Sequence, residues 1–139
     1  MVVQILVVDD EAEIREMLAR HFRFLGYSVD TAPNGRVAME KLEEVRTDIV
    51  ISDIMMPEMN GVELLAHIRD EYPMTHAIMI TGYVNLDNAM NCMRLGADTM
   101  IFKPLEDMSQ LEQAVGKAVA RIQHWLQLLN DLRAMKPAS

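Results

Sequence analysis

Short runs of apolar residues, rich in Val and Ile, alternate along the chain with longer amphipathic segments. The runs have the length of β-strands and comprise residues 4–8, 28–32, 48–52, 77–81 and 99–102. They do not alternate cleanly between apolar and polar positions, which is typical of parallel strands covered by helices on both faces. Because helical periodicity fills the segments between them, the pattern predicts an α/β domain with a doubly wound, five-stranded parallel sheet.

Five helices are predicted between and after these strands. The first places apolar residues on one stripe and ends at Gly26; the stripe comprises Ile14, Met17, Leu18, Phe22 and Leu25. The next three are expected around residues 37–42, over the segment NGVELLAHIRD, and at about residues 84–95, where Gly96 ends the pattern. The fifth is expected at about residues 108–135. Each apolar stripe must face the sheet.

The last helix is longer than this fold requires. Its apolar residues follow alternating steps of four and three, the period of a coiled-coil seam, at Leu111, Val115, Ala118, Ile122, Trp125, Leu129 and Leu132. The first half packs on the sheet, which gives a domain over residues 1–122 and an extension with a polar tail over 123–139. An isolated helix of roughly 15 residues is marginal in water, and its Trp and Leu side chains need a cover. We therefore predict homodimerisation through this helix, with folding back on the domain or docking on an absent output module as alternatives.

Length and composition limit the classes of protein to consider. The 139 residues fit one compact domain, and half of them are hydrophobic. A formal net charge of -8, without a Lys/Arg cluster, argues against direct nucleic-acid binding. No stretch approaches the roughly 20 apolar residues that span a membrane, so we expect a cytoplasmic protein with no membrane partner. Cys92 is the single cysteine, which excludes a disulfide framework.

Carboxylates stand where two of the predicted strands end. Asp9 and Asp10 follow the first strand, and Asp53 follows the third, within VISDIMMPEMNG. In a doubly wound sheet these strand ends meet at one edge, where ligands bind. Three clustered carboxylates repel one another and raise the pKa of at least one unless a cation joins them. Oxygen-only ligands suit a hard divalent ion, so the sequence predicts a Mg²⁺ site.

A hydroxyl and an ammonium group join the carboxylates at this edge. The fourth strand ends in Thr81, and Lys103 follows the fifth, directly before Pro104. A cation already neutralised by carboxylates does not need Lys103, whereas an incoming phosphoryl group brings oxygens that Lys103 and Thr81 can bind. The set indicates phosphoryl transfer with Asp53 as nucleophile.

Each of these residues also has a simpler interpretation when taken alone. Asp9 and Asp10 are common N-cap residues and could merely cap the first helix. Asp53 could be a turn former, Lys103 a surface lysine in a Lys-Pro loop, and Thr81 a strand residue that only packs. Their joint occurrence at one edge favours the functional interpretation.

Four segments, taken in order and spacing, resemble one known family. They are ILVVDDEAEIR, DIVISDIMMPEMNGVELLAHIR, IMITGY and GADTMIFKP, and together they cover roughly residues 3–121. The chain resembles the receiver domain of a two-component response regulator and is similar to the single-domain chemotaxis regulator. The resemblance implies a flavodoxin-like fold with strand order 2-1-3-4-5.

The resemblance also implies a role for each residue of the site. Asp53 would be the phosphoacceptor, while Asp10, Asp53 and the backbone carbonyl of Met55 would bind Mg²⁺ and Asp9 would order a coordinated water. Thr81 would bond a phosphoryl oxygen. Lys103 would pair with the phosphoryl group, or with Asp53 before phosphorylation, and a cis peptide would precede Pro104.

One position departs from the family pattern. Three residues before the motif lysine the family usually has Tyr or Phe, whose rotamer follows the active-site threonine, and this chain has Met100. Met is flexible enough to fill several packings, or Phe102 on the same strand face could share the task. Tyr83 and Met55 flank the pocket, where the family tunes the lifetime of the phosphoryl group.

The leading functional hypothesis is a signalling switch. A sensor histidine kinase or a histidine phosphotransfer protein would donate phosphate to Asp53, and the face of helix four, strand five and helix five would signal to a downstream output domain or target. Such a protein catalyses only its own phosphorylation and dephosphorylation. A receiver that acts by binding or dimerisation without phosphorylation is the alternative that Met100 keeps open.

Two other classes fit the sequence less well. A phosphatase with an aspartate nucleophile needs a second Asp two residues later, where Met55 stands. A flavin-binding carrier needs a Gly- and hydroxyl-rich phosphate loop after strand one, and DDEAE would repel the phosphate.

Overall fold

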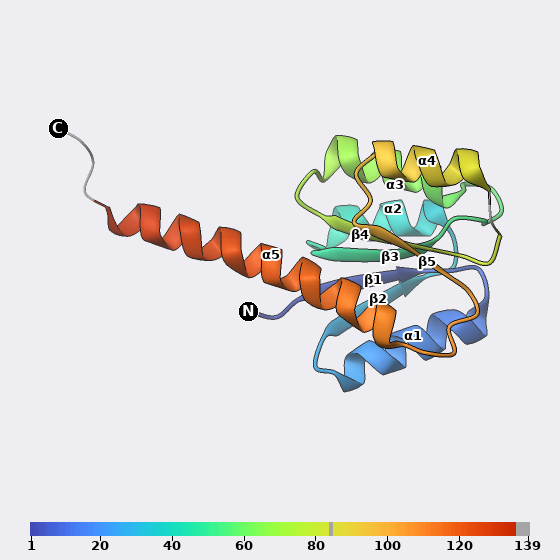
Figure 1. Ribbon diagram of the computed structural model, residues 1–139, viewed down its shortest axis with the longest axis horizontal. Helices are drawn as coiled ribbons and strands as arrows, with labels where there is room; N and C mark the ends of the chain where they lie inside the picture. The colour runs from blue at the N-terminus through green and yellow to red at the C-terminus, as the bar shows by residue number, and fades with distance from the viewer. Residues whose placement is uncertain (84, 136–139) are drawn as a thin grey trace.

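A computed structural model describes residues 1–83 and 85–135, and it contains one five-stranded parallel sheet (Figure 1). The strand order β2-β1-β3-β4-β5 confirms the order that the resemblance implied. The strands are β1 (Gln4–Val8), β2 (Ser28–Ala32), β3 (Ile49–Asp53), β4 (His76–Thr81) and β5 (Thr99–Phe102). Every strand runs parallel to its neighbours, so all five carboxyl ends lie at one edge of the sheet.

Helices cover both faces of this sheet, as the sequence predicts. They are α1 (Ala12–Phe24), α2 (Gly35–Glu44), α3 (Gly61–Glu71), α4 (Leu86–Arg94) and α5 (Ser109–Ala134). Helices α1 and α5 lie on one face, and α2, α3 and α4 lie on the other (Figure 1). Neighbouring residues of a strand therefore enter different cores: Val7 packs with α1 and α5, while Leu6 and Val8 pack with α2 and α3. This explains why the strands do not alternate between apolar and polar residues.

Element boundaries differ from the sequence prediction by one or two residues. Strand β3 begins and ends one residue later than expected, so Asp53 is its last residue and pairs in register with Ile80 of β4. Helix α4 begins at Leu86, and the expected start at residue 84 lies outside the described residues. The two glycines that were predicted to end helices do so. Gly26 follows α1 and Gly96 follows α4, with the positive φ angles of 98° and 75° that favour glycine.

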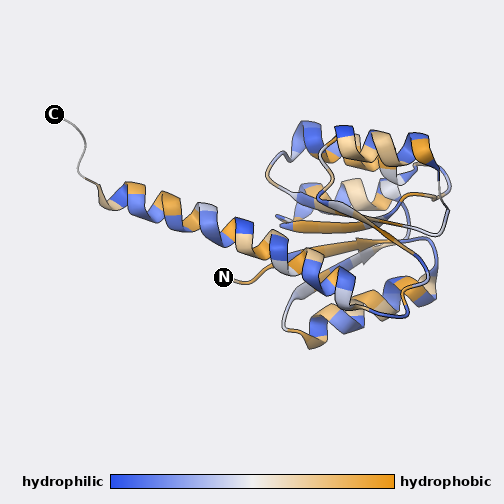
Figure 2. Ribbon diagram, viewed as in Figure 1, coloured by the Kyte–Doolittle hydropathy of each residue, from blue (hydrophilic) through white to orange (hydrophobic). Residues whose placement is uncertain are grey.

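Helix α5 has two halves with different surroundings. In the first half Leu111, Val115 and Ala118 are fully buried against the sheet and α1. Beyond Ile122 the helix projects past the sheet and does not fold back on the domain (Figure 1). Apolar residues continue along it (Figure 2), and 53% of Trp125 and 63% of Leu132 are exposed. The extension over residues 123–135 is therefore an apolar surface outside the core.

No helix in residues 1–83 or 85–135 combines the length and the apolar character that crossing a membrane would need.

Candidate functional site

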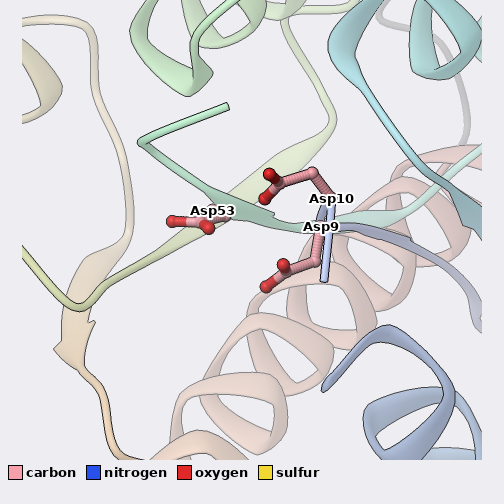
Figure 3. A group of neighbouring side chains, drawn as sticks. All are labelled: Asp9, Asp10 and Asp53. Carbon is pink, nitrogen blue, oxygen red and sulfur yellow. The ribbon is translucent and has the colours of Figure 1, made fainter. Parts of the chain in front are cut away.

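Three aspartates gather at the carboxyl edge of the sheet, and we name this group the acidic edge. Asp9 and Asp10 follow β1, Asp53 ends β3, and one carboxylate oxygen from each lies within 4.8 Å of the other two (Figure 3). Asp9 and Asp53 are buried, whereas Asp10 is exposed. The structure thus brings together the three carboxylates that the sequence placed at one edge.

Neighbouring backbone fixes Asp53 in place. Strand β3 lies between β1 and β4, and the turn that follows it closes through a hydrogen bond from the Gly61 backbone N–H to the Ile54 carbonyl, at 2.7 Å. A Cβ atom at position 61 would lie 2.3 Å from the Asp53 carbonyl oxygen, so only glycine allows this approach. The backbone N–H of Met55 donates to Asp53 Oδ1 at 3.3 Å. The carboxylate consequently leaves the sheet at a defined position.

The Lys103 ammonium group lies among three carboxylates. Its Nζ atom is 3.0 Å from Asp53 Oδ2, 3.0 Å from Glu11 Oε1 and 3.1 Å from Asp9 Oδ2, and 10% of the side chain is exposed. The peptide bond between Lys103 and Pro104 is cis, as the family resemblance implied. Burial alone would lower the pKa of Lys103, but hydrogen bonds to Glu11 and Asp53 and the nearby Asp9 carboxylate outweigh it and raise the pKa above its usual value. Lys103 is therefore charged at neutral pH.

Asp9 is the most deeply buried of the acids. Its Oδ1 atom accepts a hydrogen bond from the Glu11 backbone N–H at 2.9 Å. Its Oδ2 atom is buried and makes no well-directed hydrogen bond within the described residues, although Lys103 lies near it. Burial raises the pKa of Asp9, and the Glu11 N–H and Lys103 only partly offset that effect. A buried carboxylate oxygen without a directed partner is a group that a cation would stabilise.

The N-cap interpretation of the two aspartates is wrong. Helix α1 has Glu11 as its N-cap residue, and no side-chain hydrogen bond caps it. Asp9 and Asp10 stand outside the helix because β1 ends only one residue before Asp9, and their side chains turn toward Asp53 instead.

Thr81 and Met55 lie at the rim of the site. The Thr81 hydroxyl donates to the Tyr83 carbonyl at 2.9 Å and accepts from the Tyr83 N–H at 3.1 Å, so it is bonded to its own loop. Met55 is half exposed, and its Sδ lies 3.9 Å from the side-chain nitrogen of Asn88 on α4. Among the described residues, then, Lys103 bonds the acids directly, while Thr81 does not.

A small apolar cavity of about 220 Å³ lies between Thr81 and α4. Met100 and Phe102 of β5 and Tyr83 line it, together with residues of the α4 amino-terminal turn. Phe102 is 56% exposed and Met100 is half-buried. Met100, at the position where the family usually has an aromatic residue, therefore faces this cavity.

Glu11 is the one site residue to which the sequence assigned no role. It is the third of three consecutive acids after β1, and this adjacency is the signal that could have identified it. Its carboxylate shares the Lys103 ammonium with Asp9 and Asp53, at 3.0 Å.

The donor set fits a hard divalent cation. All candidate ligands are oxygens, two of the three carboxylates are buried, and the exposed Asp10 leaves a side open for water. Mg²⁺ prefers this combination of a few carboxylates with water ligands.

Comparison with known proteins agrees with the fold and with this chemistry. A family model described as the response regulator receiver domain matches residues 5–116. The regulatory protein AtoC of Escherichia coli is 35% identical over 84% of the chain, which spans 25% of that relative's length. A CheY-like receiver domain protein from Methanospirillum hungatei superposes with a TM-score of 0.83 at 31% identity, covering 89% of this chain and 99% of that one.

A second solved structure bears on the cofactor. The response regulator protein TrrA of Thermotoga maritima, solved in complex with Mg²⁺-BeF, is 34% identical to this chain with a TM-score of 0.76, covering 84% of this chain and 99% of that one.

Proposed function

This chain belongs to the response regulator receiver domain family of two-component signalling, and from that premise we propose that Asp53 accepts a phosphoryl group and thereby switches a protein surface. The donor is a sensor histidine kinase or a histidine phosphotransfer protein in the cytoplasm. As a receiver domain the chain is a signalling protein and not a classical enzyme. It spans about a quarter of the length of curated relatives such as AtoC, so the output it controls is part of the proposal.

The observation that carries this proposal is the position of Lys103. A buried ammonium group 3.0 Å from Asp53 and within 3.1 Å of Asp9 is already placed beside the oxygen that would bond phosphorus. Asp53, Asp9 and Glu11 compete for this one cation. When Asp53 becomes an acyl phosphate, its new oxygens provide a stronger partner for Lys103 than a shared carboxylate does.

The transfer step is a displacement at phosphorus. A carboxylate oxygen of Asp53 forms the new O–P bond, the P–N bond to the donor histidine breaks, and the histidine nitrogen keeps the electron pair. Asp10, Asp53 and the Met55 carbonyl would hold the family's cofactor Mg²⁺, with Asp9 directing a coordinated water. Bound there, the ion offsets the repulsion between the carboxylates and the phosphoryl oxygens. The same residues would support hydrolysis of the acyl phosphate by water.

Transmission of the signal begins at Thr81. Its hydroxyl has to leave Tyr83 in order to donate to a phosphoryl oxygen, which frees the loop before α4. The cavity beneath that loop gives Met100, Phe102 or Tyr83 room to move inward. The face of α4, β5 and α5 would then change its shape for an output domain or target protein.

The α5 extension is proposed to form a homodimer. Trp125, Leu129 and Leu132 continue the seam of the buried half of the helix and are half exposed or more. Association would remove this apolar area from water.

The test of the phosphorylation proposal is peptide mapping by mass spectrometry after incubation with acetyl phosphate. We expect one phosphoryl group, on the peptide that contains Asp53, and only when Mg²⁺ is present. A phosphoryl group on another residue, or none under any condition, would overturn the proposal and favour a receiver that acts by binding alone.

A further inference from the structure

An apolar groove lies at the end of the sheet opposite the acidic edge. We name this end the foot; it comprises the loops that precede β3 and β4, at residues 45–48 and 72–75. The groove has a volume of about 340 Å³, and Met74 and Tyr72 of the foot line one side while Ile122, Trp125 and Leu129 of α5 line the other. Met74 is 78% exposed. The groove lies directly beside the α5 extension, since Trp125, Leu126 and Leu129 line it.

We infer that two copies of this chain pair with their α5 extensions antiparallel, so that the carboxyl end of each helix lies in the foot groove of its partner. This inference rests on the homodimer proposed above and assigns its geometry. Three observations support it: the space available along α5, the residues that flank the seam, and the charge at the foot.

The space along α5 excludes a straight parallel pair. In a parallel pair each residue of one helix faces the same residue of the other. Followed back from Ile122, the partner helix would run along the face that carries Leu111, Val115 and Ala118, which the domain's own sheet already covers. In an antiparallel pair the partner helix runs only beside the extension, and it ends where α5 begins to contact its own sheet.

The residues beside the seam favour the same orientation. With Ile122, Trp125, Leu129 and Leu132 as the seam, Leu126 and Leu128 occupy the two flanking positions. A parallel pair would place Leu126 opposite Arg121 of the partner subunit and Leu128 opposite Arg133 of the partner subunit. An antiparallel pair with its two-fold axis near Gln127 places each of these leucines beside its own copy. Both leucines are 42–43% exposed and so are available for that contact.

The foot also offers charge that suits a helix end. In the antiparallel register Ile122 faces the partner's Leu132, so the last turn of the partner's helix enters the groove. Arg46 lines this groove and is largely exposed, and it pairs at 3.5 Å with the buried Asp48, which also lines the groove. A cation there stabilises the partial negative charge at the carboxyl end of a helix.

Cysteine cross-linking tests the orientation in the full-length chain. Leu126→Cys lies close to the two-fold axis of the antiparallel pair, and Leu132→Cys in that pair lies ten residues, or about 15 Å along the helix, from its copy. A disulfide requires the Cα atoms to be within about 7 Å. Both positions are exposed, and the native Cys92 is buried, so the unmodified chain is the background control. We expect Leu126→Cys to cross-link at least about tenfold faster than Leu132→Cys.

Light scattering on the same samples separates failure of this inference from failure of the dimer itself. A dimer in which Leu132→Cys cross-links as fast as Leu126→Cys, or in which neither cross-links, overturns the antiparallel geometry and leaves the dimer standing. A monomer at tens of micromolar, with or without acetyl phosphate, overturns both.

A variant outside α5 gives an independent measurement. Met74→Asp puts a charge on the wall of the groove, and we expect it to weaken the dimer at least about tenfold. Met93→Asp, at a similarly exposed Met that does not line the groove, is the matched control and leaves the dimer unchanged. Equal dimerisation of the two variants would show that the groove is not part of the interface.

Discussion

The acidic edge and the foot of the sheet depart from ordinary protein surfaces in opposite ways. At the acidic edge charged groups are buried: Asp9 is fully buried and Lys103 nearly so. At the foot and along the α5 extension apolar groups are exposed, Trp125 and Leu132 among them. Neither arrangement stabilises an isolated monomer, because buried charge and exposed apolar area both cost free energy.

The two regions therefore indicate two kinds of ligand. The clustered carboxylates gain from a cation, and the lysine among them gains from a phosphoryl group; both effects act over a few ångströms. An apolar helix face gains from a surface of similar length and character. In our proposals the acidic edge is the input of the switch, and the foot with the extension is the interface between two subunits.

The largest expected change in stability follows from removing the Lys103 ammonium group from the acidic edge. Lys103→Met leaves Asp9 buried without a positive partner, and we expect the free energy of unfolding without Mg²⁺ to fall by about 3 kcal/mol. Urea denaturation measures it. On the α5 extension, Leu132→Gln should leave the monomer's stability unchanged and only weaken the dimer. Equal losses in the two variants would remove the contrast between the regions.

Mg²⁺ should stabilise the chain through the acidic edge alone. At a hundredfold excess over its dissociation constant, linkage gives about 2.7 kcal/mol. Thermal melts across a millimolar Mg²⁺ series measure this, and Asp10→Ala is the control because Asp10 is exposed and its loss should not disturb the core. Leu132→Gln should keep the full Mg²⁺ effect. A midpoint that does not move with Mg²⁺ would count against the site.

Two glycines show how the acidic edge differs at the level of the backbone from an open helix face on α5. A Cβ at Gly61 would press on the Asp53 carbonyl, and we expect Gly61→Ala to cost about 2 kcal/mol and to slow phosphorylation by displacing Asp53. A Cβ at Gly116 of α5 meets no atom within 4 Å, so Gly116→Ala should stabilise the helix by up to about 1 kcal/mol. Urea denaturation of both variants gives the sign, and a stabilising Gly61→Ala would contradict the close approach.

The partly exposed ion pair between Asp30 and Lys41 gives the smallest effect, and it shows by comparison what burial adds at Lys103. Burial would raise the pKa of Asp30, but the Lys41 hydrogen bond and the Thr31 N–H lower it below 3.8. Stability from a depressed carboxyl pKa is present above the unfolded value and is lost as the pH falls through the folded value. Asp30→Asn should therefore cost less than about 1 kcal/mol at neutral pH and nothing well below pH 3.8. A difference that persists in acid would mean that the pair does not act through charge.

The sequence predicts most of this architecture because the fold depends on periodic apolar patterns. The strands and the gathering of Asp9, Asp10 and Asp53 at one edge follow from where apolar runs end, whereas the strand order was implied by the family resemblance. The contact between Glu11 and Lys103 could not be predicted, since it joins residues 92 positions apart through side-chain rotamers. The same holds for the Thr81 hydroxyl, whose bond to Tyr83 is set by the local loop. The foot groove depends on how α5 packs beside the two loops of the foot. The apolar periodicity of the sequence does not predict this tertiary arrangement.

The central claim is that Asp53 carries the phosphoryl group, and the most direct measurement is the phosphate stoichiometry of Asp53→Asn beside the unmodified chain. With acetyl phosphate and Mg²⁺, intact-mass analysis should show one phosphoryl group on the unmodified chain and none on Asp53→Asn, because the amide oxygen is a poor nucleophile. Thr81→Ala and Lys103→Ala should still take up some phosphate, since those residues contact the product and do not form the bond. Stoichiometric phosphate on Asp53→Asn would contradict the account.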